Sequence, residues 1–124
     1  YVLKDFGEEP DLLIIATGSE IHLALGAAEL LKDEFTPRVV SMPSMYLFEK
    51  QPDEYKRQVL PPELTRRAAA EAGRQEPWYR WVGRDGVILG IDHFGHSAPY
   101  KVLAETYGFT PESFAKMIRE KFAG

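Results

Sequence analysis

The stretch that decides the fold is LLIIATGSEIHLAL, residues 12–25. Residues 12–16 form a continuous apolar run, which is typical of a strand buried on both faces of a parallel sheet. A break that contains Gly18 and Ser19 follows, and apolar residues then return at helical spacing. The stretch therefore predicts a strand, a turn and a mostly buried helix over residues 20–34, with Ser19 as the N-cap.

Strand and helix patterns alternate along the rest of the chain. RVVSM (38–42) and GVILGI (86–91) predict further buried strands, and a short helix is predicted at residues 53–59. LTRRAAAEAG (64–73) is ambiguous, because its composition favours a helix while its place after a crossover suits a strand. The alternation predicts an α/β fold, a three-layer sandwich around a mainly parallel sheet.

Two helices are predicted near the carboxyl end of the chain. Ser97 can cap the first, and Gly108 fits the position just past its end. The second has Thr110 as its cap, Pro111 at its first position and Phe114 on its apolar stripe.

Length and composition limit the class of protein. A chain of 124 residues with 44% hydrophobic and 27% charged residues predicts one globular domain, residues 1–124. A net charge of -4, with no basic cluster larger than Arg66 and Arg67, argues against binding to nucleic acid or an anionic membrane. The absence of cysteine excludes disulfides, thiolate zinc sites and a cysteine nucleophile, and it fits a cytoplasmic protein.

The turn ATGSE (16–20) is the first candidate binding site, with Gly18 and Ser19 as its ligand-facing residues. Helix amino ends that follow parallel strands can bind anions. The signal is weak, because one glycine without a lysine is no phosphate-loop motif and the charge of Glu20 opposes a phosphate. A capped turn with a folding role is the preferred interpretation, and an anion site is the alternative.

The segment DHFGH (92–96) is the second candidate site. Asp92, His93 and His96 follow a predicted strand, and two histidines with a carboxylate can bind zinc or iron. Gly95 separates the histidines, however, and the next helix is predicted to begin only after them. A surface loop is the preferred interpretation, with a metal site as the alternative.

Several segments, taken in their order and spacing, resemble the carboxyl-terminal domain of transketolases over essentially the whole chain. They are IATGSEIHLAL, RVVSMPS, VLPPELTRRAAAEAG, WYRWVGRDG, GIDHFGHSAP and YGFTPESF. The resemblance implies a five-stranded mixed sheet in a three-layer α/β/α sandwich. It also implies that YVLKD (1–5) is the one antiparallel strand and that residues 65–72 form a strand.

The resemblance also implies a function. Transketolases move a two-carbon ketol unit between ketose and aldose phosphates, and thiamine diphosphate with magnesium supplies the chemistry. In that family the reactive groups lie in the preceding diphosphate-binding and pyrimidine-binding domains. The asparagine of the family's magnesium motif is missing from this chain, which contains none. We therefore expect no catalytic, cofactor-binding or metal-binding residue here.

The expected role is structural: packing against the pyrimidine-binding domain and support of the transketolase homodimer. We expect the chain alone to be inactive and to expose an apolar patch, including Trp78 or Trp81, that the absent domain covers. Two alternatives stay open. One is a small-ligand regulatory module that binds an anion or nucleotide near Ser19 and His93, and the other is the metal site. Gly18, Ser19, His93 and His96 are the weak ligand or interface candidates.

Overall fold

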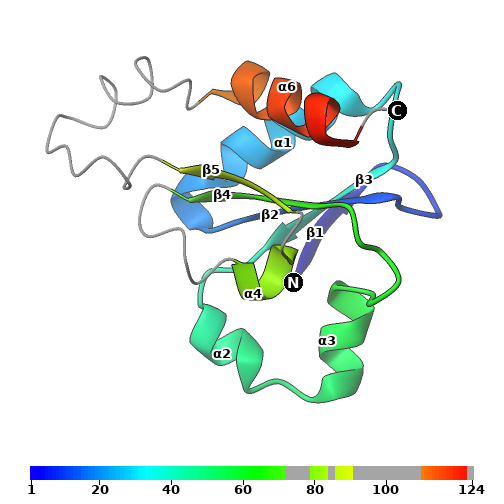
Figure 1. Cartoon of the computed structure of the whole chain (residues 1–124). Coiled ribbons are helices and arrows are strands. Elements are labelled where there is room, and N and C mark those ends of the chain that lie inside the picture. Colours follow the sequence, from blue (N-terminus) through cyan, green and yellow to red (C-terminus); the bar gives the residue numbers. More distant parts are fainter. Residues whose placement is uncertain (72–78, 84–85, 91–109, 123–124) are drawn as a thin grey trace, which may run out of the picture.

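The computed structural model describes residues 1–71, 79–83, 86–90 and 110–122 of the chain (Figure 1). In chain order the described elements are β1 (Val2–Asp5), β2 (Leu12–Ala16), the 3-10 helix η1 (Gly18–Glu20), α1 (Ile21–Leu31), β3 (Pro37–Ser41), α2 (Met45–Glu49), α3 (Asp53–Val59), β4 (Arg67–Glu71), α4 (Tyr79–Val82), β5 (Val87–Gly90) and α6 (Pro111–Phe122).

The described strands form one five-stranded sheet in the order β1-β3-β2-β4-β5. β1 runs antiparallel to β3, and the other neighbouring strands are parallel. In the central strand, Ile14 is in register with Val39 of β3 and Ala68 of β4. The mixed sheet with an antiparallel edge strand is therefore confirmed, and so is the strand at β4.

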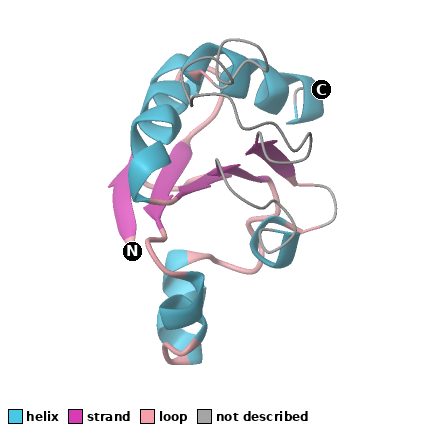
Figure 2. Cartoon of the chain, turned by 90° about the vertical axis from the view of Figure 1, so that its left-hand side faces the viewer, coloured by secondary structure: helices cyan, strands magenta, loops and turns pink. Residues whose placement is uncertain are grey.

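Helices cover both faces of this sheet. α1 and α6 lie side by side on one face, and α2, α3 and α4 lie on the other (Figures 1 and 2). The predicted three-layer α/β/α sandwich is confirmed. We call the layer of α1 and α6 the long-helix layer and the layer of α2, α3 and α4 the short-helix layer.

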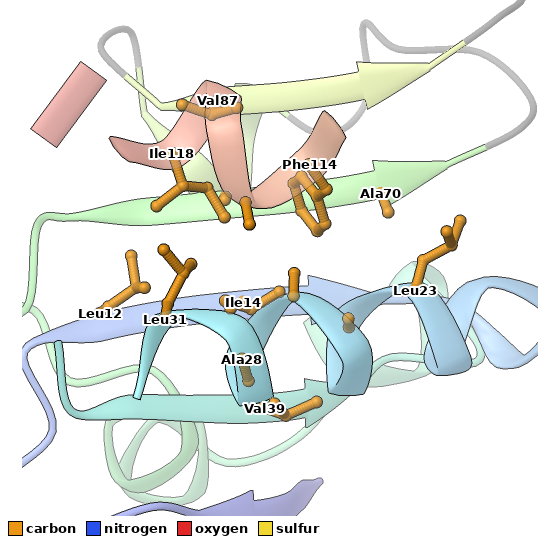
Figure 3. Packing of buried hydrophobic residues seen from close by; sticks show 14 of the residues in the cluster. Leu12, Ile14, Leu23, Ala28, Leu31, Val39, Ala70, Val87, Phe114 and Ile118 are labelled. Atoms are coloured by element: carbon orange, nitrogen blue, oxygen red, sulfur yellow. The ribbon is translucent and has the colours of Figure 1, made fainter. Parts of the chain in front are cut away.

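The central strand β2 supplies apolar side chains to both faces, since successive side chains of a strand point in opposite directions. Leu12 and Ile14 belong to the core under α1 and α6 (Figure 3). Leu13 and Ile15 belong to the core on the other side, with Phe48 of α2. All five residues of β2 have no exposed surface, which explains its continuous apolar run.

α6 begins as its sequence predicts. The backbone N–H of Ser113 donates a hydrogen bond to Thr110 Oγ1 at 3.1 Å, so Thr110 is the cap. Phe114 and Ile118 are fully buried against α1 and the sheet (Figure 3). The predicted apolar stripe is confirmed.

The prediction for α1 was wrong at both ends. The chain leaves β2 through η1, so Ser19 lies inside the first turn and not before it. α1 itself ends at Leu31 and not at residue 34, because the N–H groups of Glu34 and Phe35 both bond back to the Leu31 carbonyl. That turn returns Phe35 to the core.

The short-helix layer contains elements that periodicity did not predict. The helix predicted at residues 53–59 is confirmed as α3, but α2 and α4 were not predicted. They have five and four residues, which is too short for a repeating apolar pattern. The helix predicted to follow Ser97 lies outside the described residues.

Candidate functional site

The turn after β2 holds a buried carboxylate. Glu20 is only 2% exposed, and the hydroxyl of Thr17 donates to Glu20 Oε2 at 2.8 Å. The backbone N–H of Glu20 also donates to the Thr17 carbonyl at 3.0 Å. A carboxylate fixed at this helix start repels a phosphate, so the local electrostatics favour a folding role for this turn.

The two predicted ligand residues in the turn differ in what the structure describes. Gly18 is exposed, and a Cβ atom there would meet nothing within 4 Å. Among the described glycines, positive φ occurs only at Gly83, so the backbone of Gly18 does not require glycine. The side chain of Ser19 lies outside the described part of the chain. As ligand contacts, both residues stay predictions.

Asp92, His93 and His96 lie outside the described residues, as does Trp78. The preferred interpretation of this segment as a surface loop and the alternative of a metal site therefore both stay predictions. Within the described ranges, no group of three His, Asp or Glu side chains is placed to hold a metal ion.

The exposed apolar patch was expected to include Trp78 or Trp81, and the structure describes only Trp81, which is buried. Trp81 is 9% exposed and packs edge-on against Phe48 of α2, with ring centroids 5.2 Å apart at 79°. Phe48 also lies 6.1 Å from the ring of Tyr55 in α3. The residue that covers Trp81 is Phe48 of α2. Because the sequence did not predict α2, it did not predict the burial of Trp81 either.

Arg67 at the start of β4 connects the pieces of the short-helix layer. Its guanidinium donates to the carbonyls of Leu64 at 2.8 Å, Pro61 at 2.8 Å and Trp81 at 2.7 Å. Burial lowers the pKa of Arg67, although an arginine in this state remains charged at neutral pH. The half-buried cation therefore ties the loop after α3 to the carboxyl end of α4.

Two adjoining hollows of ≈ 460 and ≈ 480 Å³ surround Arg67, and both are also lined by Arg80 and Trp81. Most of the cationic side chains that line these hollows already bind a partner within the protein. Lys56 lies 3.5 Å from Asp53, and Arg80 lies 2.5 Å from Glu49. Arg67 donates hydrogen bonds to the carbonyls of the residues named in the preceding paragraph. The arrangement stabilises the layer, and among the described residues that line the hollows it pairs no nucleophile with a base.

An exposed apolar surface lies instead on α2 and its neighbours. Tyr46 is 67% exposed, Leu47 60%, Tyr55 36% and Tyr1 53%. Tyr1, Leu47 and Tyr55 line one open hollow of ≈ 230 Å³. We call these four residues the α2 face. The letters MYLF within a polar segment were the available sequence signal for it.

In the described part of the chain, the longest helix is the 12-residue α6 and none could span a bilayer.

The comparisons with known proteins agree with one another. A family model described as the transketolase-like TK C-terminal domain matches residues 1–110. The transketolase of Aquifex aeolicus is 54% identical over 98% of this chain, but the match covers only 18% of that protein.

Solved structures give the same result. A transketolase from Leishmania mexicana is similar with a TM-score of 0.85 and 38% identity over 97% of this chain and 17% of its own. A Pichia stipitis transketolase in complex with sedoheptulose-7-phosphate matches with a TM-score of 0.82 and 30% identity over 98% of this chain and 17% of its own. The chain spans less than a fifth of the length of these relatives, at their C-terminal part. It belongs to the family of transketolase C-terminal domains.

Proposed function

We propose that residues 1–124 form the C-terminal domain of a thiamine-diphosphate-dependent transketolase. The whole enzyme transfers a two-carbon ketol unit between ketose and aldose phosphates. One observation carries this proposal: relatives called transketolase match nearly the whole chain at about half identity, over only a small part of their own length. A relative solved with sedoheptulose-7-phosphate, a ketose phosphate, supports the substrate class.

The described residues do not fit the cofactor. A magnesium diphosphate needs several hard oxygen ligands and free amide donors. The chain has no asparagine, and the described ranges hold no cluster of three possible ligand side chains. The helix start after β2 carries the buried carboxylate of Glu20. We therefore assign thiamine diphosphate and magnesium to the parts of the enzyme that precede this chain.

The contribution of this chain is structural. It packs against the pyrimidine-binding domain, beside the diphosphate-binding domain, and helps to hold a cytoplasmic homodimer together. The small-ligand alternative is not proposed, because none of the relatives reported above supports it.

The test is an activity assay of the full-length protein. With thiamine diphosphate, Mg²⁺, xylulose phosphate and an aldose phosphate, we expect the full-length protein to transfer the ketol unit. The same protein should sediment as a dimer. We expect no turnover from the 124-residue chain. A folded, cofactor-loaded full-length protein without transfer would contradict the activity, and turnover by the 124-residue chain would contradict the structural role.

A further inference from the structure

We propose that the α2 face (Tyr1, Tyr46, Leu47 and Tyr55) is the docking surface for the polypeptide that precedes Tyr1 in the longer transketolases. The inference rests on the proposed function, because it requires this chain to be part of such a protein. It goes beyond that function by naming the side chains that make the contact.

One side of α2 is held by packing and a capping hydrogen bond, and the other side is exposed to solvent. The side chain of Ser44 caps it by accepting a hydrogen bond from the Leu47 N–H at 3.2 Å. Phe48 is 6% exposed and anchors the helix between the rings of Tyr55 and Trp81. With Phe48 directed into the core, Tyr46 and Leu47 are held outward on a short, anchored helix.

Most of the exposed large apolar residues in the described ranges gather on the α2 face. Within the described ranges, the large apolar residues with an exposed fraction of at least 36% are Tyr1, Leu3, Leu30, Tyr46, Leu47 and Tyr55. Four of these six belong to the α2 face, and three of those four line the same hollow. Single exposed apolar residues are ordinary, but a cluster around a hollow marks an interface. Tyrosine is common at such surfaces, because its rigid ring loses little conformational entropy on docking and its hydroxyl can keep a hydrogen-bond partner.

The length of the relatives indicates which polypeptide covers the α2 face. The relatives match this chain at their C-terminal part, and more than four-fifths of their length lies outside the match. That length continues on the amino side of Tyr1. The backbone of Tyr1 is fixed at the sheet edge, where its carbonyl accepts from the Ser41 N–H at 2.8 Å. If this chain is part of a protein of that length, as proposed above, the polypeptide joined to Tyr1 starts within the α2 face.

The experiment measures how well position 47 is covered in the full-length protein. Leu47→Cys and the matched control Leu30→Cys, which lies on α1 and is 45% exposed, are labelled with a maleimide in the native and the urea-unfolded protein. Peptide mass spectrometry reads each position separately. Because thiol reactivity follows exposure, we expect native labelling at position 47 to slow by about tenfold or more relative to the unfolded protein. Leu30→Cys should slow by much less. A smaller reduction at position 47 than tenfold overturns the proposal.

A photo-reactive cross-linker on the Leu47→Cys thiol identifies the occupant. Cross-links to residues that precede Tyr1, in either subunit, support the proposal. Cross-links only to another copy of residues 1–124, or none, overturn it. Neither readout uses activity. A full-length protein that lacks ketol transfer but protects position 47 contradicts the proposed function alone, and an active protein that leaves position 47 open contradicts the docking surface alone.

Discussion

The long-helix and short-helix layers cover the same sheet by different physical means. In the long-helix layer, α1 and α6 have 11 and 12 residues and bury apolar stripes against each other and the sheet. In the short-helix layer, α2, α3 and α4 have five, seven and four residues. Helices of this length are not stable in water by themselves, so their stability must come from the contacts that hold them.

Apolar side chains such as Phe48 and Trp81 provide part of these contacts, and side-chain hydrogen bonds to backbone carbonyls provide another part. Arg38 of β3 donates to the Gln58 carbonyl at 2.8 Å, at the end of α3. Lys56 of α3 donates to the Glu49 carbonyl at 3.1 Å, at the end of α2. Arg67 donates to the Trp81 carbonyl at 2.7 Å, near the carboxyl end of α4. Each cation lies near the carboxyl end of a helix, where the helix dipole also favours a positive charge.

The difference between the layers separates two roles. Of the two helical layers, only the long-helix layer has side chains with no exposed surface among the described residues, such as Leu31, Phe114 and Ile118, so it contributes more to the stability than the short-helix layer. The short-helix layer presents exposed tyrosines and leucine on anchored short helices. Substitutions at five positions test this division, from the largest expected effect to the smallest.

Phe114→Ala should have the largest effect. Phe114 has no exposed surface and packs between α1 and the sheet, so we expect a loss of about 4 kcal/mol in the free energy of unfolding. Phe48→Ala should cost less, about 2–3 kcal/mol, because its site borders an open hollow that can collapse or hydrate. Urea unfolding of the 124-residue chain measures both. Equal losses would contradict the division between the layers.

Arg67→Met should cost about 2 kcal/mol, because half-buried carbonyls lose a charged donor while the aliphatic stem is kept. Arg67→Lys is the matched variant. It keeps the charge, but one ammonium cannot reach the three carbonyls in the geometry of a guanidinium, so we expect most of the same loss. Urea unfolding gives the size, and hydrogen exchange of α4 amides should rise in both variants. Full rescue by lysine would mean that charge alone matters here.

Gly26→Ala tests the close approach of the two long helices. A Cβ at position 26 would lie 2.8 Å from Cβ of Pro111, at the start of α6. Alanine gains about 1 kcal/mol of helix propensity, but overpacking against a rigid ring costs more, so we expect a net loss of about 1 kcal/mol.

A double-mutant cycle with Pro111→Gly isolates the contact at position 26, because removing the ring should make Gly26→Ala neutral or stabilising. If Gly26→Ala stabilises the chain with Pro111 intact, α1 and α6 are less tightly packed than the distance indicates.

The sequence predicted β2 and α6 well because their signals are local. The continuous apolar run of β2 and the cap at Thr110 each follow from a few neighbouring residues. β4 was different, since its alanines favour a helix by propensity. Ala68, Ala69 and Ala70 are fully buried between β2 and β5, and this tertiary environment, which the family resemblance indicated, decides the strand.

The candidate surface could not be predicted in the same way. Exposure of Leu47 depends on the cap by Ser44 and on the docking of Phe48 against Trp81, which is 33 positions further along the chain. No local pattern contains that contact. The cap predicted at Ser19 failed for a related reason, because η1 places that residue inside a turn whose Thr17 and Glu20 side chains bond to each other.

Leu47→Ser should have the smallest effect on the 124-residue chain. Leu47 is 60% exposed, and serine leaves its backbone hydrogen bond to Ser44 Oγ intact, so we expect the free energy of unfolding to change by less than about 0.5 kcal/mol. In the full-length protein the same change removes apolar area from the proposed contact and should lower the temperature of unfolding or loosen the dimer. If Leu47→Ser lowers the free energy of unfolding of the 124-residue chain as much as Phe48→Ala does, Leu47 stabilises the short-helix layer itself and is not reserved for contact with a partner.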